Sequence, residues 1–201
     1  MTARLILRYP NSLLRTASEP VGDEDWGDRV EKWCSDIGDT MKANVGMSLA
    51  APQVGIHKRI FGVNARDLDS PEVFQQNPRD GVIFFINPEV TLVSGESAKS
   101  MESCLSVPSF MYSVKRSAVI DLAYTAPDKR RIVVRVEGED AVVIQHEAEH
   151  LDGKLFTDRL NPFDRKDFLK EFEKPKRKKT EGELKHLREQ KRVQARNKRK
   201  K

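Results

Sequence analysis

The sequence predicts an α+β fold in which mostly antiparallel strands pack around a central helix. A long amphipathic segment lies near the start of the chain, short apolar segments typical of strands fill its middle, and a helix-forming segment follows them. Strands that follow one another along the chain, instead of alternating with helices, favour antiparallel pairing. With 201 residues, the chain is long enough for one domain with a substantial core.

The first predicted helix covers residues 25–45. Its apolar side chains recur at intervals of three and four residues, and acidic side chains occupy the other side, as expected of a helix with one buried face. We interpret both tryptophans of this segment as core residues. The apolar positions are Trp26, Val30, Trp33, Ile37 and Met41.

Predicted strands and turns come next. Residues 46–55 form a loop of small residues, and Asn87-Pro88 interrupts an apolar run, so that strand segments lie on both sides of it. Residues 126–129 form a turn, and the segment after it alternates between polar and apolar side chains, as in a half-buried strand. The predicted strands cover residues 59–63, 82–86, 89–93, 114–124 and 131–136.

The second predicted helix contains the segment Gln145 to Gly153, with the sequence Gln-His-Glu-Ala-Glu-His-Leu-Asp-Gly. The apolar residues 142–144 lead into it, Asp140 is the candidate N-cap, and Gly153 stands where a helix C-terminus often uses a positive φ. A short helix is also predicted over residues 164–173, and a proline ends it.

His146 and His150 are four residues apart, so a helix places both imidazoles on one face, where they can bind the same metal ion. Glu147, next to the first histidine, can take a proton from a water molecule bound to that metal. The alternative is a polar helix face in solvent, which the apolar residues before the motif disfavour. The sequence therefore predicts that the central helix binds a metal.

Two histidines do not complete a catalytic metal site, which normally has three protein ligands. Cys104 lies in a turn of small residues, and a thiolate is a strong ligand for soft or borderline metals, although free cysteines are more often buried apolar residues. The other candidates are acidic residues downstream in a segment typical of a surface helix: Asp158, Asp164, Asp167, Glu171 and Glu173.

Charge divides the chain near residue 174. Residues 174–201 contain 14 Lys and Arg against 3 Asp and Glu, so this tail carries +11 and residues 1–173 carry −6. We predict a catalytic domain over residues 1–173 and a basic C-terminal tail over residues 174–201, which is helical when bound to a polyanionic partner. Such a partner is the function class that this charge asymmetry indicates.

The cellular setting follows from what the sequence lacks. Two cysteines, Cys34 and Cys104, are too few for a disulfide framework in a chain of this length. Residues 1–10 do not have the pattern of a signal peptide, and no run of 18 apolar residues occurs. We therefore expect a cytoplasmic protein in a reducing compartment.

Three segments carry the candidate site: residues 46–53 read Gly-Met-Ser-Leu-Ala-Ala-Pro-Gln, residues 102–106 read Glu-Ser-Cys-Leu-Ser, and residues 145–153 contain the His-Glu-x-x-His helix. They resemble the signature motifs of the peptide deformylase family, which are Gly-x-Gly-x-Ala-Ala-x-Gln, Glu-Gly-Cys-Leu-Ser and, in loose form, Gln-x-x-His-Glu-x-x-His-Leu-x-Gly, with Glu149 where Asp is usual. The three motifs occur in the family's order, and the resemblance covers residues 4 to 170 approximately.

The resemblance implies a reaction and a set of roles. Cys104, His146 and His150 would bind one divalent metal ion, usually Fe(II), with Zn, Ni or Co able to substitute. Glu147 would be the general acid and base, and Gln53 with the Leu105 backbone N–H would bind the formyl oxygen. The reaction removes the formyl group from the N-terminal methionine of a nascent polypeptide.

The resemblance also implies partners. The substrate peptide would lie against the loop containing Gly46, Met47 and Ser48. From the residues themselves, Met47 with Val142 and Val143 could line a pocket for the methionine side chain, and ordinary packing in the core is the alternative for these three. The basic tail would bind the ribosome surface, both its rRNA and its proteins, and the alternative is a solvated run of charge that only aids solubility. We expect a monomer that binds neither DNA nor membranes.

Two family glycines are serines here, Ser48 and Ser103. A positive φ at Ser48 would strain the loop by about 1–2 kcal/mol. If the family uses its glycine only for the close approach of another group, the serine side chain would instead narrow the substrate cleft. The Ser103 hydroxyl could donate to the Cys104 sulfur or to a water molecule on the metal. Because neither change removes a ligand, the acid/base or an oxyanion donor, we expect an active enzyme.

Two other function classes fit parts of the sequence. A metallopeptidase acting on an ordinary amide would use the His-Glu-x-x-His helix but would have no need of Cys104 or Gln53. A ribosome- or RNA-binding protein with an attenuated active site would account for the basic tail and the two serines.

Overall fold

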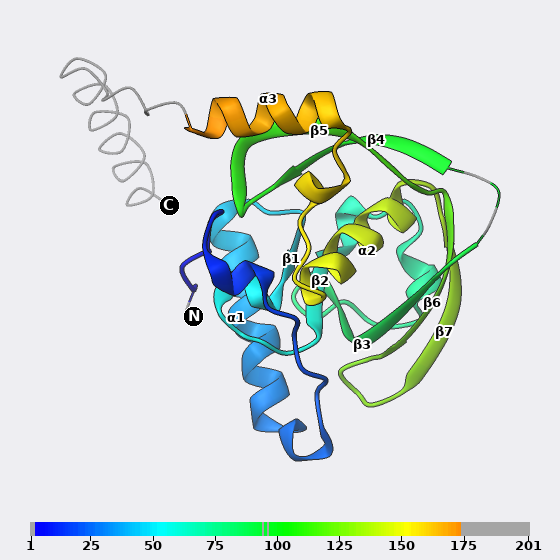
Figure 1. The fold of residues 1–201 in the computed structure, drawn as a ribbon. Coiled ribbons are helices and arrows are strands. Elements are labelled where there is room, and N and C mark those ends of the chain that lie inside the picture. The colour runs from blue at the N-terminus through cyan, green and yellow to red at the C-terminus, as the bar shows by residue number, and fades with distance from the viewer. Residues whose placement is uncertain (1–2, 94, 96, 174–201) are drawn as a thin grey trace, which may run out of the picture. The chain divides into compact units, whose positions relative to one another are not determined.

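An antiparallel sheet with the strand order β1-β2-β3-β6-β7 forms the centre of residues 1–166 in the computed structural model (Figure 1). The structure describes residues 3–93, 95 and 97–173, and the chain has two compact units, Met1–Lys166 and Asp167–Lys201. The predicted tail, residues 174–201, lies outside the described residues. The strands of this sheet are β1 (Ser48–Ala50), β2 (Ile60–Asn64), β3 (Val82–Leu92), β6 (Val119–Thr125) and β7 (Arg131–Glu137).

A separate antiparallel hairpin consists of β4 (Ser97–Cys104) and β5 (Val107–Ser117). The sequence did not predict β4, because Glu102 is its one buried residue and the strand therefore has no apolar face. The strand predicted over residues 114–124 is wrong as a single element: β5 ends at Ser117, and β6 begins at Val119 in the other sheet. The predicted loop at residues 46–55 contains β1 and the 3-10 helix Ala51–Val54.

Helix α1 (Asp28–Asn44) confirms the first predicted helix, although residues 23–25 form a separate 3-10 turn before it. Its buried residues pack against Ile60 of β2 and Phe84 of β3 in one apolar cluster, with both tryptophans partly buried at its margin. The helix ends where Val45 adopts the left-handed region, with φ of 53°. Its buried apolar side chains are Val30, Cys34, Ile37 and Met41.

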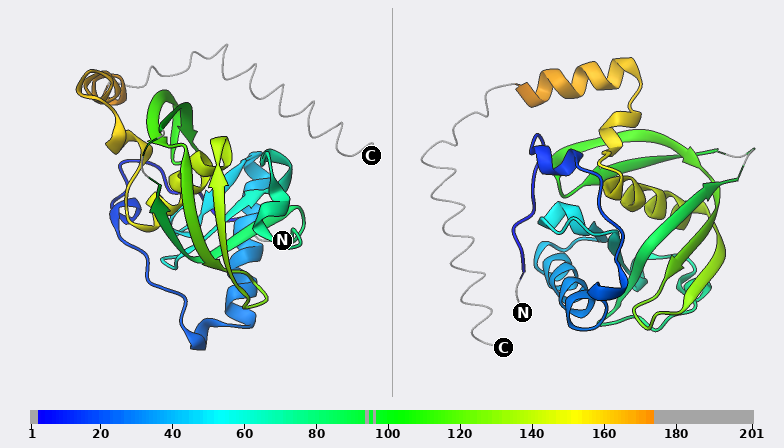
Figure 2. Two further views of the ribbon diagram at one scale, coloured as in Figure 1. Left: turned by 90° about the vertical axis from the view of Figure 1, so that its right-hand side faces the viewer. Right: turned by 60° about the horizontal axis from the view of Figure 1, so that its bottom comes forward.

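Helix α2 (Gly138–Leu151) covers the opposite face of the same strands. It packs in one apolar cluster with Phe61 and Phe85, whereas α1 packs with Ile60 and Phe84. Because successive side chains of a strand point to opposite faces of the sheet, the two helices lie on opposite faces. Figure 2 shows both helices from two further sides. The inward-facing residues of α2 recur every three or four positions, which leaves another face of the helix for polar side chains. They are Ala141, Ile144, Ala148 and Leu151.

Of the two predicted ends of α2, the N-terminal one is wrong and the C-terminal one is confirmed. Asp140 is not the N-cap, since the helix begins at Gly138; its buried carboxylate accepts the backbone N–H groups of Asp69 and Ser70 at 2.8 and 3.0 Å. Gly153 has the predicted positive φ, 71°, and a Cβ added there would lie 2.6 Å from the Arg15 carbonyl oxygen. Glycine is therefore required both for backbone conformation and for close approach.

Helix α3 (Pro162–Glu173) confirms the helix predicted over residues 164–173 and crosses the boundary between the two units. The Asn161 side chain caps its start by accepting the backbone N–H groups of Phe163 and Asp164 at 3.0 Å each. Within residues 3–93, 95 and 97–173, no helix has the length and apolar character that a membrane span requires.

Candidate metal centre

The Cys104 side chain lies next to those of His146 and His150, which both belong to α2. Their ligand atoms all lie within 4.8 Å of one another, and the Cys104 sulfur is 3.3 Å from His150 Nε2. Cys104 reaches the histidines from the end of β4, where the pairing of β4 with β5 shifts register. The structure thus brings together the three residues that the motifs singled out.

None of the acidic alternatives for the third position belongs to the cluster of ligand atoms found among the described residues. Asp158 pairs with Arg15, and Asp164 accepts a hydrogen bond of 2.6 Å from the Asn161 side chain. The others, Asp167, Glu171 and Glu173, belong to the second unit. Cys104 is therefore the third member of the cluster.

The two histidines of the cluster have opposite pKa shifts. Burial lowers the pKa of His146, but its contact with Cys104 and its hydrogen bond with Glu102 outweigh burial and raise it to about 10, so a metal ion would displace the proton of this imidazole on binding. Burial and the charge of His146 hold the pKa of His150 well below its usual range, so that His150 is neutral, the form that binds metals. One thiol and two imidazoles are donors suited to a borderline divalent metal.

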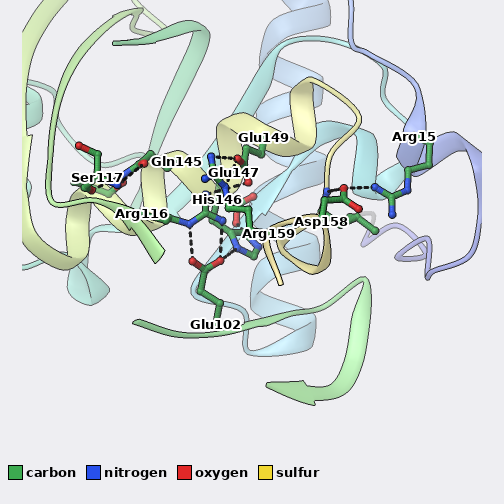
Figure 3. Close-up of polar contacts among 12 residues, drawn as sticks. Arg15, Glu102, Arg116, Ser117, Gln145, His146, Glu147, Glu149, Asp158 and Arg159 are labelled. Carbon is green, nitrogen blue, oxygen red and sulfur yellow. Dashed lines mark hydrogen bonds and ion pairs between the residues drawn. The ribbon is translucent and has the colours of Figure 1, made fainter. Parts of the chain in front are cut away.

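Glu102, which Arg116 holds in turn, orients the imidazole of His146. Its Nδ1 donates to Glu102 Oε2 at 2.7 Å, which leaves Nε2 for the cluster (Figure 3). Arg116, which is 2% exposed, donates to both oxygens of Glu102 at 2.5 and 2.8 Å and to Glu149 at 3.0 Å. Burial opposes ionisation of Glu102, but the hydrogen bonds from His146 and Arg116 lower its pKa to about 2.

Sequence reasoning missed Arg116, because an arginine in an exposed-looking strand carries no signal of burial. Its ion pair with Glu102 connects strands β5 and β4 of the hairpin, and its ion pair with Glu149 connects the hairpin to α2. Glu149 in turn accepts a hydrogen bond of 2.6 Å from Arg159 (Figure 3).

Glu147 lies next to the cluster and is 2% exposed. Its Oε1 is 4.0 Å from His146 Nε2 and accepts a hydrogen bond of 2.7 Å from the Ser48 hydroxyl, whereas its buried Oε2 has no partner among the described residues. Burial raises the pKa of Glu147, and the His146 charge and the Ser48 hydrogen bond only partly oppose this effect. A carboxyl group with a raised pKa beside a cluster of metal-type ligands is suited to the role of general acid/base.

Gln53 is fixed with its amide nitrogen toward the same cluster. Its Oε1 accepts the Ala50 N–H at 2.8 Å, and its Nε2 donates to Ser106 Oγ at 3.0 Å and to the Cys104 sulfur at 3.3 Å. Ser103 is exposed, so the donor at the sulfur is Gln53 and not the neighbouring serine as the sequence suggested.

Ser48 lies in β1 and is not among the residues with positive φ, so the first of the two alternatives for this position, a strained loop, does not apply. Gly46 lies close to the end of the Leu105 side chain, which would have to shift if residue 46 had a Cβ, since that atom would lie 2.9 Å from it. A cavity of about 500 Å³ opens beside the cluster. The predicted substrate residues Gly46, Met47, Ser48, Val142 and Val143 all line it.

Comparison with known proteins decides the family. A family model described as polypeptide deformylase matches residues 3–166. The chain belongs to the peptide deformylase family. The peptide deformylase of Polynucleobacter necessarius is 37% identical over 165 residues, which are 82% of this chain and 90% of that protein. The peptide deformylase of Helicobacter hepaticus is 38% identical over 173 residues, 86% of this chain and 91% of that protein.

Solved structures of deformylases share the fold. The peptide deformylase of Ehrlichia chaffeensis in complex with actinonin has a TM-score of 0.73 and 31% identity, covering 89% of this chain and all of that one. The Plasmodium falciparum deformylase with an inhibitor has a TM-score of 0.70 and 29% identity, covering 83% and 97%. This deformylase removes the N-formyl group from the initiator methionine of nascent polypeptides, and the comparisons do not support the metallopeptidase or RNA-binding alternatives.

Proposed function

We propose that Cys104, His146 and His150 hold one divalent metal ion and that Glu147, Gln53 and the Leu105 backbone N–H carry out the deformylation. The observation that carries this assignment is the convergence of the three ligand atoms within 4.8 Å beside a buried carboxylate. Following the family resemblance, the physiological metal is Fe(II), and Zn, Ni or Co can substitute for it.

When bound, the metal would supply Lewis acidity and an activated water molecule at neutral pH. Glu147 accepts the proton of the attacking water and later delivers it to the nitrogen of the leaving amine, so that the C–N bond breaks and formate departs. Negative charge develops on the formyl oxygen, where the Gln53 amide and the Leu105 N–H donate hydrogen bonds. Loss of one such donor typically slows a reaction by about 10²–10³-fold.

The cavity beside the cluster binds the substrate. Met47, Val142 and Val143 contact the methionine side chain, and the peptide backbone pairs with the loop of Gly46 to Ser48 as an added strand. Support comes from the place of these residues on the cavity wall and from a relative: the Acinetobacter baumannii deformylase, 27% identical with a TM-score of 0.68, has been solved with Met-Ala-Ser bound.

The direct test measures formate release from formyl-Met-Ala-Ser before and after metal chelation. We expect chelation to abolish release and anaerobic addition of Fe(II) to restore it, with Zn, Ni and Co compared at equal loading. Acetyl-Met-Ala-Ser is the matched control, because a general amidase would cleave it as well. Formate release that survives complete removal of metal would contradict the assignment.

We also propose that the basic tail brings the enzyme to its substrate in the cytoplasm as a monomer. The +11 charge of residues 174–201 supports binding to ribosomal RNA phosphates, and six to ten such contacts should weaken by orders of magnitude between roughly 50 and 200 mM salt. Deleting residues 174–201 should abolish salt-sensitive co-sedimentation with ribosomes while hydrolysis of short formyl peptides continues. Undiminished co-sedimentation of the deleted protein would reject the docking role.

A further inference from the structure

The Ser48 hydroxyl donates a hydrogen bond of 2.7 Å to Glu147 Oε1, although the two residues are 99 positions apart in the chain. Ser48 belongs to β1, where it pairs with Val63 of β2, and its neighbours are held as well: Asn64 donates from its backbone to the Met47 carbonyl at 2.9 Å. The hydroxyl therefore projects from a well-supported strand toward a side chain on α2.

The two oxygens of the Glu147 carboxylate have different surroundings. Oε1 accepts the Ser48 hydrogen bond, whereas Oε2 is buried and has no partner among residues 3–93, 95 and 97–173. A glutamate side chain has three rotatable bonds, so a carboxylate without an anchor samples several positions. Anchoring one oxygen leaves the other oriented and available for a proton.

We propose that Ser48 is a positioning residue for deformylation, whose hydroxyl holds Glu147 Oε1 and thereby directs Oε2 to the attacking water and the leaving amine. This inference rests on the proposed role of Glu147. Glycine, which the family motif has at this position, offers no such donor. In this chain the serine therefore supports the general acid/base, which a glycine at the same position could not do.

The contact should act on the reaction step more than on substrate binding. Hydrogen bonds to ionised groups are the stronger ones, and a general acid/base must lie within hydrogen-bond distance of the proton that it moves. Because Ser48 holds Glu147 and Glu147 makes its transfer only during the reaction, the loss of the hydroxyl should appear in kcat and leave KM nearly unchanged.

The test compares Ser48→Ala, Ser48→Gly and Ser48→Thr in the metal-loaded full chain. We expect kcat for formyl-Met-Ala-Ser to fall about tenfold in the alanine and glycine variants, with KM within about twofold. The threonine variant keeps the hydroxyl and suits a strand, so it should retain kcat within about threefold. Metal content and the unfolding midpoint, measured in parallel, should stay at wild-type values.

Ser117→Ala is the control. The Ser117 hydroxyl also makes partly buried contacts, donating to the backbone carbonyls of Val93 and Val119 at 3.2 and 2.6 Å, but Ser117 does not line the cavity and its hydroxyl does not contact Glu147. Its removal should leave kcat unchanged. An equal loss in the control, or an alanine variant of Ser48 with kcat within twofold of wild type, would overturn the proposal.

A double variant separates this inference from the proposed function. In the Glu147→Ala background, Ser48→Ala should cause no further loss, because the hydroxyl then has nothing to position. A second tenfold loss there would mean that Ser48 acts on the substrate directly, which overturns the positioning role. Wild-type activity in Glu147→Ala itself would instead refute the proposed role of Glu147.

Discussion

Replacing Cys104 by alanine should abolish turnover and remove tight metal binding. The cluster would keep only two imidazoles on α2, and the thiolate is its one anionic ligand. Metal analysis after gel filtration and formate release from formyl-Met-Ala-Ser measure the two effects. Cys104→Asp keeps an anionic ligand but exchanges a soft donor for a hard one, so it should bind metal more weakly and retain part of the activity.

Cys34→Ala is the control for Cys104. Cys34 is fully buried in α1, where burial raises the pKa of its thiol to about 12, and it is not part of the cluster of Cys104, His146 and His150. We expect its replacement to leave metal content and turnover intact. Full activity in Cys104→Ala would exclude the three-ligand site and return the third position to a downstream acid.

Replacing Glu147 by alanine should lower kcat by at least about 10²-fold, because a positioned general acid/base typically accelerates a reaction by that factor or more. The metal content should stay at the wild-type level, because Cys104, His146 and His150 remain. Binding of a formylated peptide, measured by calorimetry, should also persist.

Glu147→Gln provides the isosteric comparison. Its amide retains the shape of the side chain and can still accept the Ser48 hydrogen bond, but it cannot take up a proton, so kcat should fall as far as in the alanine variant. Loss of metal from either variant would identify Glu147 as a ligand or structural support, and the mechanism would need another base.

The sequence predicted features that are local in the chain. The amphipathic period of α1 and the His146–His150 spacing are each contained in one element, and the structure confirms α1 and groups the histidines with Cys104. The positive φ at Gly153 is likewise a property of a single helix end. Periodicity and motif spacing can therefore predict such features without knowledge of the tertiary fold.

Features that depend on contacts between distant segments could not be predicted in this way. Asp140 looks like a helix cap, but it binds the backbone of residues 69 and 70, which no local pattern indicates. Strand β4 has a polar sequence because its buried residue, Glu102, is neutralised by Arg116 from β5. The Ser48 contact with Glu147 is of the same kind, since it joins a strand to a helix far along the chain.

The charged residues behind His146 restrict how this protein can change in evolution. Glu102, Arg116, Glu149 and Arg159 alternate in sign along a chain of ion pairs, so that their formal charges cancel (Figure 3). Loss of one partner of a buried pair leaves the other charge uncompensated, which typically destabilises a protein by about 3–5 kcal/mol. Glu102 and Arg116 form the buried pair of this network, so a single replacement of either is expected to be strongly destabilising, and an apolar replacement of both would also remove the hydrogen bond that orients His146. The network must be inherited as a unit, and its members are expected to covary among descendants of this chain.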